Sequence, residues 1–192
     1  MVKILGISGS VSRPSRTASL VREILAAFPR EAGLETGQLD LADVAPDLFK
    51  ALTRADLRGR NSEIVHAVEQ ADLLVVATPV YRASYTGALK HLFDLVDHEA
   101  FAGKPVILAA TGGTLLHGLI TEHQLRPLFG FLGALTLPTT IYAVEQDFTT
   151  HQLTSAKISE RIARVVGEAL AQLAVRPSGA VTIPVLKLAA SG

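Results

Sequence analysis

The chain has 192 residues, 48% of them hydrophobic, and its 18 lysines and arginines balance 18 aspartates and glutamates. The formal net charge is therefore zero, which excludes the overall basic field that holds nucleic acids or anionic membrane surfaces. The sequence contains no cysteine. This excludes disulfides, zinc–thiolate sites and redox dithiols, so any redox chemistry must come from a bound cofactor.

Apolar runs of strand length alternate with segments of helical periodicity along the chain. The apolar runs are continuous, which is typical of parallel strands buried on both faces. In chain order, the predicted elements are a strand over 2–7, a helix over 17–28, a strand over 34–41, a helix over 61–70, a strand over 71–80, a helix over 85–97, a strand over 104–110, a helix over 119–132, a strand within 135–144 and a helix over 154–174. The polar, proline-containing stretch from residue 42 to Arg60 is a connection whose structure the sequence determines poorly.

Two regions depart from this alternation. Pro127 falls inside the helix predicted over 119–132, and because it has no amide hydrogen, the helix must kink, widen or restart near it. Helical periodicity is lost after residue 175, so we expect one domain over residues 1–175 and a flexible C-terminal tail over 176–192.

The alternation predicts an α/β fold, a doubly wound five-stranded parallel sheet with helices on both faces. Ligands of such sheets bind beyond the carboxyl ends of the strands. The loops to compare are therefore those over 9–17, 78–86 and 111–114. We find no signal peptide and no apolar run of about 20 residues, so we expect a soluble cytoplasmic protein that does not enter a membrane.

The first of these loops, within the stretch GSVSRPSRTASL, favours a phosphate. Ser10, Ser15 and Thr17 supply hydroxyl groups, Arg13 or Arg16 supplies a forked cation, and the following helix N-terminus attracts anions. The alternative is an ordinary serine-capped turn. Neither the nucleotide-triphosphate loop motif nor the dinucleotide fingerprint is present, so a bound phosphate would be a monophosphate.

The other two loops suit a flat ligand. Pro79 stiffens the second loop, where Tyr81 and Tyr85 could flank a ring or simply pack against the next helix. Gly112 and Gly113 in the third loop let the backbone approach a ring, although a glycine pair is also an ordinary turn. All three loops at one sheet edge together indicate flavin mononucleotide, FMN.

The stretches GSVSRPSRTASL, ATPVYRASYTGALKHLFD and LAATGGTLLH together resemble the NAD(P)H-dependent FMN reductases with a flavodoxin-like fold. More narrowly, they resemble the type that supplies reduced FMN to two-component sulfonate monooxygenases, closest to the methanesulfonate-linked branch. The resemblance implies a homodimer or homotetramer, FMN as a loosely held substrate and NADH or NADPH as hydride donor. It implies a cofactor site formed by Ser10, Ser15, Arg16, Thr17, Pro79, Val80, Tyr81, Thr111, Gly112 and Gly113.

One position departs from the resemblance. His123 stands where the alkanesulfonate type has a tyrosine, in a widened π-type turn at the tetramer interface, and such a turn would also suit Pro127. We favour an exposed or interface histidine over a flavin-proximal one. A metal site is not expected, because His117, Glu122 and His123 do not form the HExxH arrangement.

Rival functions remain open from sequence. A quinone or azo-dye reductase would share the fold but hold FMN tightly, and an electron carrier would bind FMN without oxidising NAD(P)H. Composition also leaves open a non-enzymatic, Rossmann-like regulator.

Overall fold

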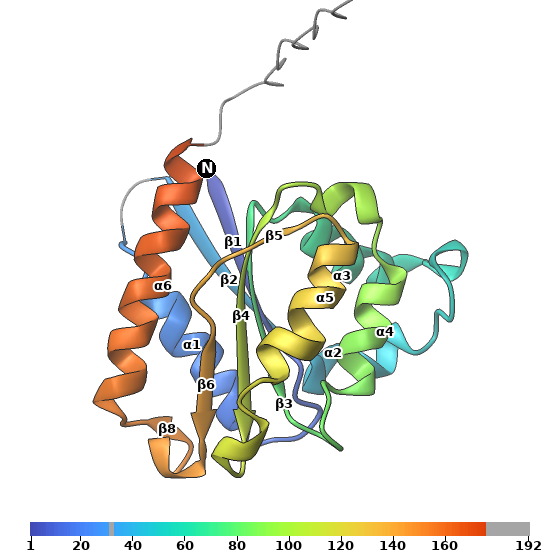
Figure 1. Ribbon diagram of the computed structural model, residues 1–192. Helices are drawn as coiled ribbons and strands as arrows, with labels where there is room; N and C mark the ends of the chain where they lie inside the picture. The colour runs from blue at the N-terminus through green and yellow to red at the C-terminus, as the bar shows by residue number, and fades with distance from the viewer. Residues whose placement is uncertain (31–32, 176–192) are drawn as a thin grey trace, which may run out of the picture.

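A parallel β-sheet lies at the centre of the computed structural model, which describes residues 1–30 and 33–175 (Figure 1). Its strands are ordered β2-β1-β3-β4, and two short strands, β5 and β6, share the fifth position beside β4. The strands are β1 Val2–Ser8, β2 Leu34–Asp40, β3 Leu73–Pro79, β4 Pro105–Gly112, β5 Leu135–Thr136 and β6 Ile141–Val144. The predicted five-stranded, doubly wound parallel sheet is confirmed.

Helices cover both faces of this sheet (Figure 1). They are α1 Arg16–Ala26, α2 Leu41–Leu48, α3 Gly59–Gln70, α4 Gly87–Leu95, α5 Arg126–Phe131 and α6 Ala156–Val175. One cluster of buried side chains, which includes Leu20 and Val165, packs helices α1 and α6 against one face of the sheet. A second cluster, which includes Leu92 and Phe129, packs helices α2, α3, α4 and α5 against the other face. The central strands β3 and β4 are buried between these layers, which explains their continuous apolar sequences.

The connection after β2, which the sequence determines poorly, begins with a helix, because residues 41–48 form α2. Leu41, Val44 and Leu48 are buried at helical spacing. Pro46 lies inside this helix and removes one amide hydrogen. Burial of the apolar face outweighs that single lost bond, so the proline does not break the helix.

The single fifth strand predicted within 135–144 is divided. β5 pairs with the beginning of β4 and β6 with its end. Pro138 lies between them, and a proline cannot donate a hydrogen bond to a neighbouring strand. The structure also contains a hairpin absent from the sequence prediction, formed by β7 Phe148–Thr149 and β8 Gln152–Leu153. Strands of two residues are too short to show a periodic pattern.

A widened π-helical turn, η4 Thr121–Leu125, precedes α5. The amide of Arg126 donates to the carbonyl of Thr121, five residues back. The Arg126 guanidinium also binds the Glu122 carboxylate at 2.5 and 3.0 Å, which lowers the pKa of Glu122. The prediction that the helix must widen or restart near Pro127 is confirmed.

Short 3₁₀ turns complete the chain at η1 Arg54–Asp56, η2 His98–Phe101, η3 Leu115–His117 and η5 Glu145–Asp147. Within the described part of the chain, no helix is long and apolar enough to cross a membrane. The tail predicted over 176–192 lies outside the described residues.

Candidate functional site

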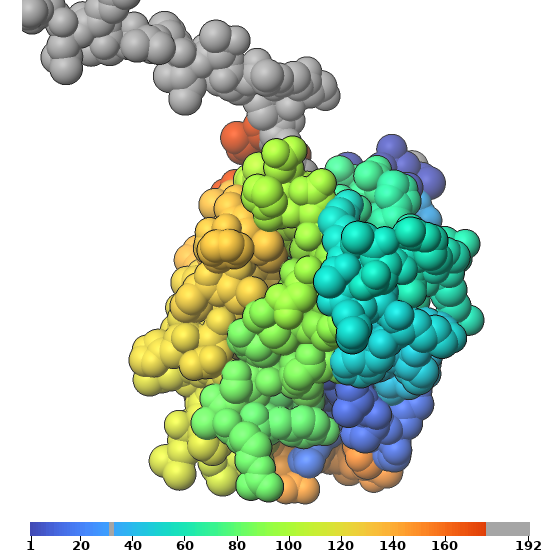
Figure 2. Space-filling model, turned by 90° about the vertical axis from the view of Figure 1, so that its right-hand side faces the viewer, coloured from blue at the N-terminus to red at the C-terminus, as the bar shows by residue number. Residues whose placement is uncertain are grey.

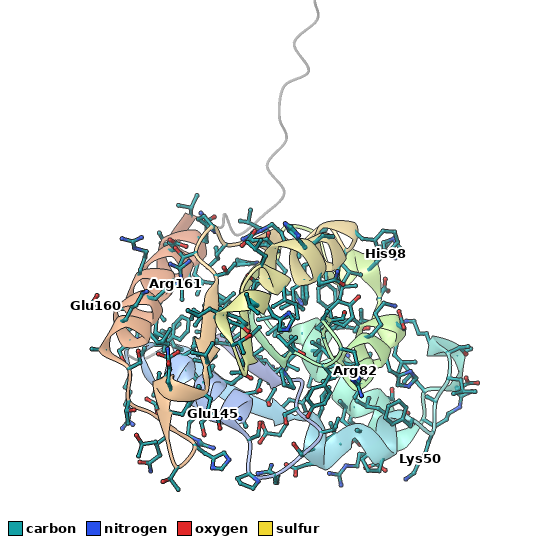
Figure 3. The ribbon with its side chains drawn as sticks, turned by 60° about the horizontal axis from the view of Figure 1, so that its bottom comes forward. Lys50, Arg82, His98, Glu145, Glu160 and Arg161 are labelled. Atoms are coloured by element: carbon teal, nitrogen blue, oxygen red, sulfur yellow. The ribbon has the colours of Figure 1, made fainter. Side chains whose placement is uncertain are left out.

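The loops that follow β1, β3 and β4 enclose a cleft of about 200 Å³ at the carboxyl edge of the sheet. Figure 3 brings this edge forward, with Arg82 on the loop after β3 and Glu145 on the segment after β6. All the residues predicted to surround a cofactor line this cleft: Ser10, Ser15, Arg16, Thr17, Pro79, Val80, Tyr81, Thr111, Gly112 and Gly113. The structure brings the whole predicted set together, while the binding role of each residue stays a prediction.

The N-terminus of α1 contributes hydrogen-bond donors to the cleft. Ser15 caps the helix, since its Oγ accepts the amide of Ala18 at 3.2 Å and its carbonyl accepts the amide of Ser19 at 3.1 Å. Arg16 and Thr17 are the first two helical residues, so their amides have no acceptor within the helix. These amides and the helix dipole favour an anion at this point.

The structure distinguishes Arg13 from Arg16, the two arginines that the sequence offered as the cation for a phosphate. Arg13 does not line the cleft; its guanidinium binds Asp43 at 3.0 and 2.5 Å and Asp40 at 2.9 Å. Arg16 does line the cleft, and its Nη1 lies 3.2 Å from Oε1 of Glu145. Of these two arginines, Arg16 is therefore the one placed where a ligand in the cleft could meet it.

Hydrogen bonds fix the three loops to one another. The Oγ1 atoms of Thr17 and Thr111 lie 2.6 Å apart, and both side chains are buried. Thr86 Oγ1 donates to the carbonyl of Gly9 at 2.7 Å, and the amide of Val80 donates to the carbonyl of Thr111 at 2.8 Å. These bonds hold the walls of the cleft in place, which reduces the entropy lost when a ligand binds.

A tight turn shapes the mouth of the cleft. Tyr81 and Ser84 exchange backbone hydrogen bonds of 2.9 and 3.1 Å. Between them, Arg82 and Ala83 have left-handed φ values of 51° and 64°, as the central residues of a type I′ turn require. The side chain of Tyr81 stays 45% exposed. An aromatic side chain is therefore presented at the entrance.

Three residues that line the cleft were missed by sequence reasoning: Ser12, Pro14 and His151. Ser12 and Pro14 belong to the phosphate-type loop, so its composition could have included them. His151 lies in the turn of the β7–β8 hairpin, where Thr150 and His151 have φ values of 47° and 69°. No motif around His151 indicated this position.

The two glycines after β4 have different roles. A Cβ on Gly112 would stand 2.0 Å from the hydroxyl of Tyr142, which donates to the carbonyl of Thr114 at 2.6 Å. Burial raises the pKa of Tyr142. A Cβ on Gly113 would meet no atom within 4 Å. Packing of the protein itself requires Gly112, whereas Gly113 leaves space beside the cleft.

His123 is exposed on the π-helical turn and does not line the cleft. It borders a separate hollow of about 290 Å³ together with Leu116, Leu119 and Ile120. Across residues 1–30 and 33–175, no group of three or more His, Cys, Asp or Glu side chains could hold a metal ion.

The chemistry of the cleft fits FMN. Ser10 is 4% exposed, and its Oγ lies 3.3 to 3.4 Å from Ser12 atoms, so these bonds are long and can yield to a phosphate. The free amides and Arg16 add charged and neutral donors at the same place. The backbone from Pro79 to Tyr81 and the open side of Gly113 bound the space that a flat ring needs.

This fold and this cleft define a flavodoxin-like, FMN-binding protein. The chain belongs to the NADPH-dependent FMN reductase family, whose family model matches residues 2–149. It is accordingly an oxidoreductase that uses NAD(P)H and FMN.

Individual relatives agree with this membership. The chain is 46% identical to a Pseudomonas fluorescens (strain Pf0-1) protein named NADH-dependent FMN reductase SfnF, over 98% of both chains. It is 43% identical to a Pseudomonas aeruginosa protein named FMN reductase (NADPH), over 89% of this chain and 91% of the relative. The solved apo structure of an NADH:FMN oxidoreductase, EmoB, superposes with a TM-score of 0.80 at 32% identity, over 93% of both chains.

Proposed function

We propose that this enzyme supplies reduced FMN to a two-component, flavin-dependent sulfonate monooxygenase in the cytoplasm. The observation that carries the proposal is the limited enclosure of the cleft. Its volume is about 200 Å³, below the roughly 300–1,000 Å³ of pockets that enclose a drug-sized ligand, and Tyr81 at its mouth is 45% exposed. A cleft that covers only part of a flavin is compatible with the release of reduced FMN as a product.

In this proposal, the cradle around α1 holds the phosphate, and the two other loops hold the ring. Ser10, Ser15, Arg16 and Thr17 supply donors to the phosphate oxygens, and Thr111 anchors Thr17. FMN bound there would supply the redox chemistry, as the acceptor of a hydride from NADH or NADPH. The residues of the protein therefore bind and orient, and no side chain has to act as an acid or base.

We also propose that the protein forms a homodimer or homotetramer. Leu115, Leu116 and Leu119 are 71%, 87% and 63% exposed on the segment after β4, and Phe131 at the end of α5 is 85% exposed. Figure 2 shows this segment and α5 on one face, beside α4. Exposed apolar side chains gathered on one face are typical of a subunit interface. Light scattering after gel filtration measures the assembly, and a monomer at micromolar concentration would refute this part.

The decisive experiment measures NADH and NADPH oxidation by the purified protein with and without added FMN. It also records whether flavin absorbance stays with the protein after gel filtration. We expect turnover that needs added FMN, from a protein that retains little flavin. A protein that retains FMN and reduces quinones or azo dyes without added flavin would instead be a reductase of organic acceptors.

A further inference from the structure

The acidic side chain of Glu145 forms an ion pair with Arg16, the cation that we predict binds the FMN phosphate. Oε1 of Glu145 lies 3.2 Å from Nη1 of Arg16. Glu145 begins η5 directly after β6, and the carboxylate of Asp147 fixes this turn by accepting the amide of Val144 at 2.8 Å. The backbone of this turn thus places Glu145 within reach of Arg16.

Glu145 borders a hollow that adjoins the cleft. The cleft and a neighbouring hollow of about 480 Å³ share Gly113, and Glu145 lines the second of them while its partner Arg16 lines the first. The first turn of α1 contains no acidic residue of its own. Glu145 therefore supplies an acidic partner to the arginine of this helix N-terminus, where an anionic ligand is expected.

This ion pair has little part in holding the fold together. The side chains of Arg16 and Glu145 are 35% and 74% exposed, and ion pairs so open to water add little to stability. The ion pair instead affects how strongly Arg16 can bind an anionic ligand. A phosphate group bound by Arg16 would have to displace the carboxylate or share the guanidinium with it, and the two negative charges would repel each other.

We propose that Glu145 is a displaceable counterion that competes with the FMN phosphate for Arg16 and so keeps the affinity for FMN low. This inference rests on the proposed function, since low affinity serves an enzyme that releases its flavin. Coulomb's law with salt screening gives roughly a three- to tenfold change in affinity when one unit charge near a phosphate dianion is removed from a solvated site.

The test compares dissociation constants for FMN and for riboflavin, which has the same ring and no phosphate. The proteins are the natural enzyme, Glu145→Gln and the control Glu160→Gln. Glu160 is an exposed acidic residue on α6, away from the cleft in Figure 3. We expect Glu145→Gln to bind FMN about three- to tenfold more tightly while its riboflavin affinity stays unchanged, and Glu160→Gln to match the natural enzyme for both ligands.

Three results would overturn the inference: unchanged FMN affinity in Glu145→Gln, an equal gain for riboflavin, or the same gain in Glu160→Gln. An equal gain would assign the effect to the ring site, and a gain in the control would assign it to overall charge. If riboflavin binds too weakly to measure, an equal lower limit on its dissociation constant in each protein counts as unchanged. NAD(P)H turnover is measured separately, so an enzyme that binds FMN but oxidises no nucleotide would refute the proposed function and leave this result standing.

Discussion

The two edges of the sheet use their polar groups in opposite ways. At the amino edge, Lys104 is 3% exposed and donates to the carbonyls of Val68 and Glu69 at 3.3 and 2.7 Å. The Glu69 carboxylate in turn accepts Arg54 at 2.5 Å and the amide of Asp97 at 2.8 Å. At the carboxyl edge, hydroxyls, helix amides and an arginine face a cleft. One edge satisfies its polar groups internally and supports the fold, whereas the other leaves donors for a ligand.

The largest effect is expected at the amino edge. Replacing Lys104 by methionine keeps a long side chain but leaves the last carbonyls of α3 without their buried donor, which should cost about 2–3 kcal/mol in the free energy of unfolding. Urea denaturation measures this, with Lys157→Met on the exposed side of α6 as the control. FMN affinity of the folded variant should not change. A loss of FMN affinity without a loss of stability would contradict the conclusion that the amino edge stabilises the fold and does not bind the ligand.

The next effect belongs to the carboxyl edge. Replacing Arg16 by alanine removes the charged donor from the cleft and should weaken FMN binding roughly tenfold to hundredfold, since one charge-assisted hydrogen bond is lost. Riboflavin binding and the urea midpoint should stay as they are. Arg22→Ala, farther along α1, is the matched control. Unchanged FMN affinity in Arg16→Ala would remove this arginine from the site.

A smaller effect is expected from the ring side of the same cleft. Replacing Gly113 by valine places a branched side chain in the space that its backbone leaves open, and should weaken FMN and riboflavin equally, by roughly fivefold. Fluorescence titration with both flavins distinguishes this from the phosphate-specific loss in Arg16→Ala. A loss confined to FMN would place Gly113 beside the phosphate and contradict the arrangement proposed for the cleft.

The sequence predicted the sheet and most of the helices because each central strand is a continuous apolar run. It failed where packing overrides the local signal. α2 forms around Pro46 because its apolar face is buried, and the two-residue strands β7 and β8 are fixed by Phe148 and Leu153 against the core. Neither contact can be read from residues adjacent in the chain.

The sequence also predicted most of the residues that line the cleft, because the order of strands and helices fixes where the loops meet. Parallel strands end at one edge, so loops identified by unusual composition had to meet there. Glu145 and His151 could not be found in this way, because they come from a segment whose position depends on the divided fifth strand and the small hairpin. Selecting Arg16 over Arg13 likewise required the ion pairs of Arg13 with Asp40 and Asp43.

The two glycine-free turns have a further consequence for protein engineering. Among the described residues, the non-glycine positions with left-handed φ are Arg82, Ala83, Thr150 and His151. Each of these conformations costs on the order of 1 kcal/mol, which glycine would largely relieve. An attempt to raise heat resistance by introducing glycine there would loosen the two turns that hold Tyr81 and His151 at the cleft. At these four positions, a substitution that raises thermal stability is therefore expected to make the entrance for the flavin less well defined.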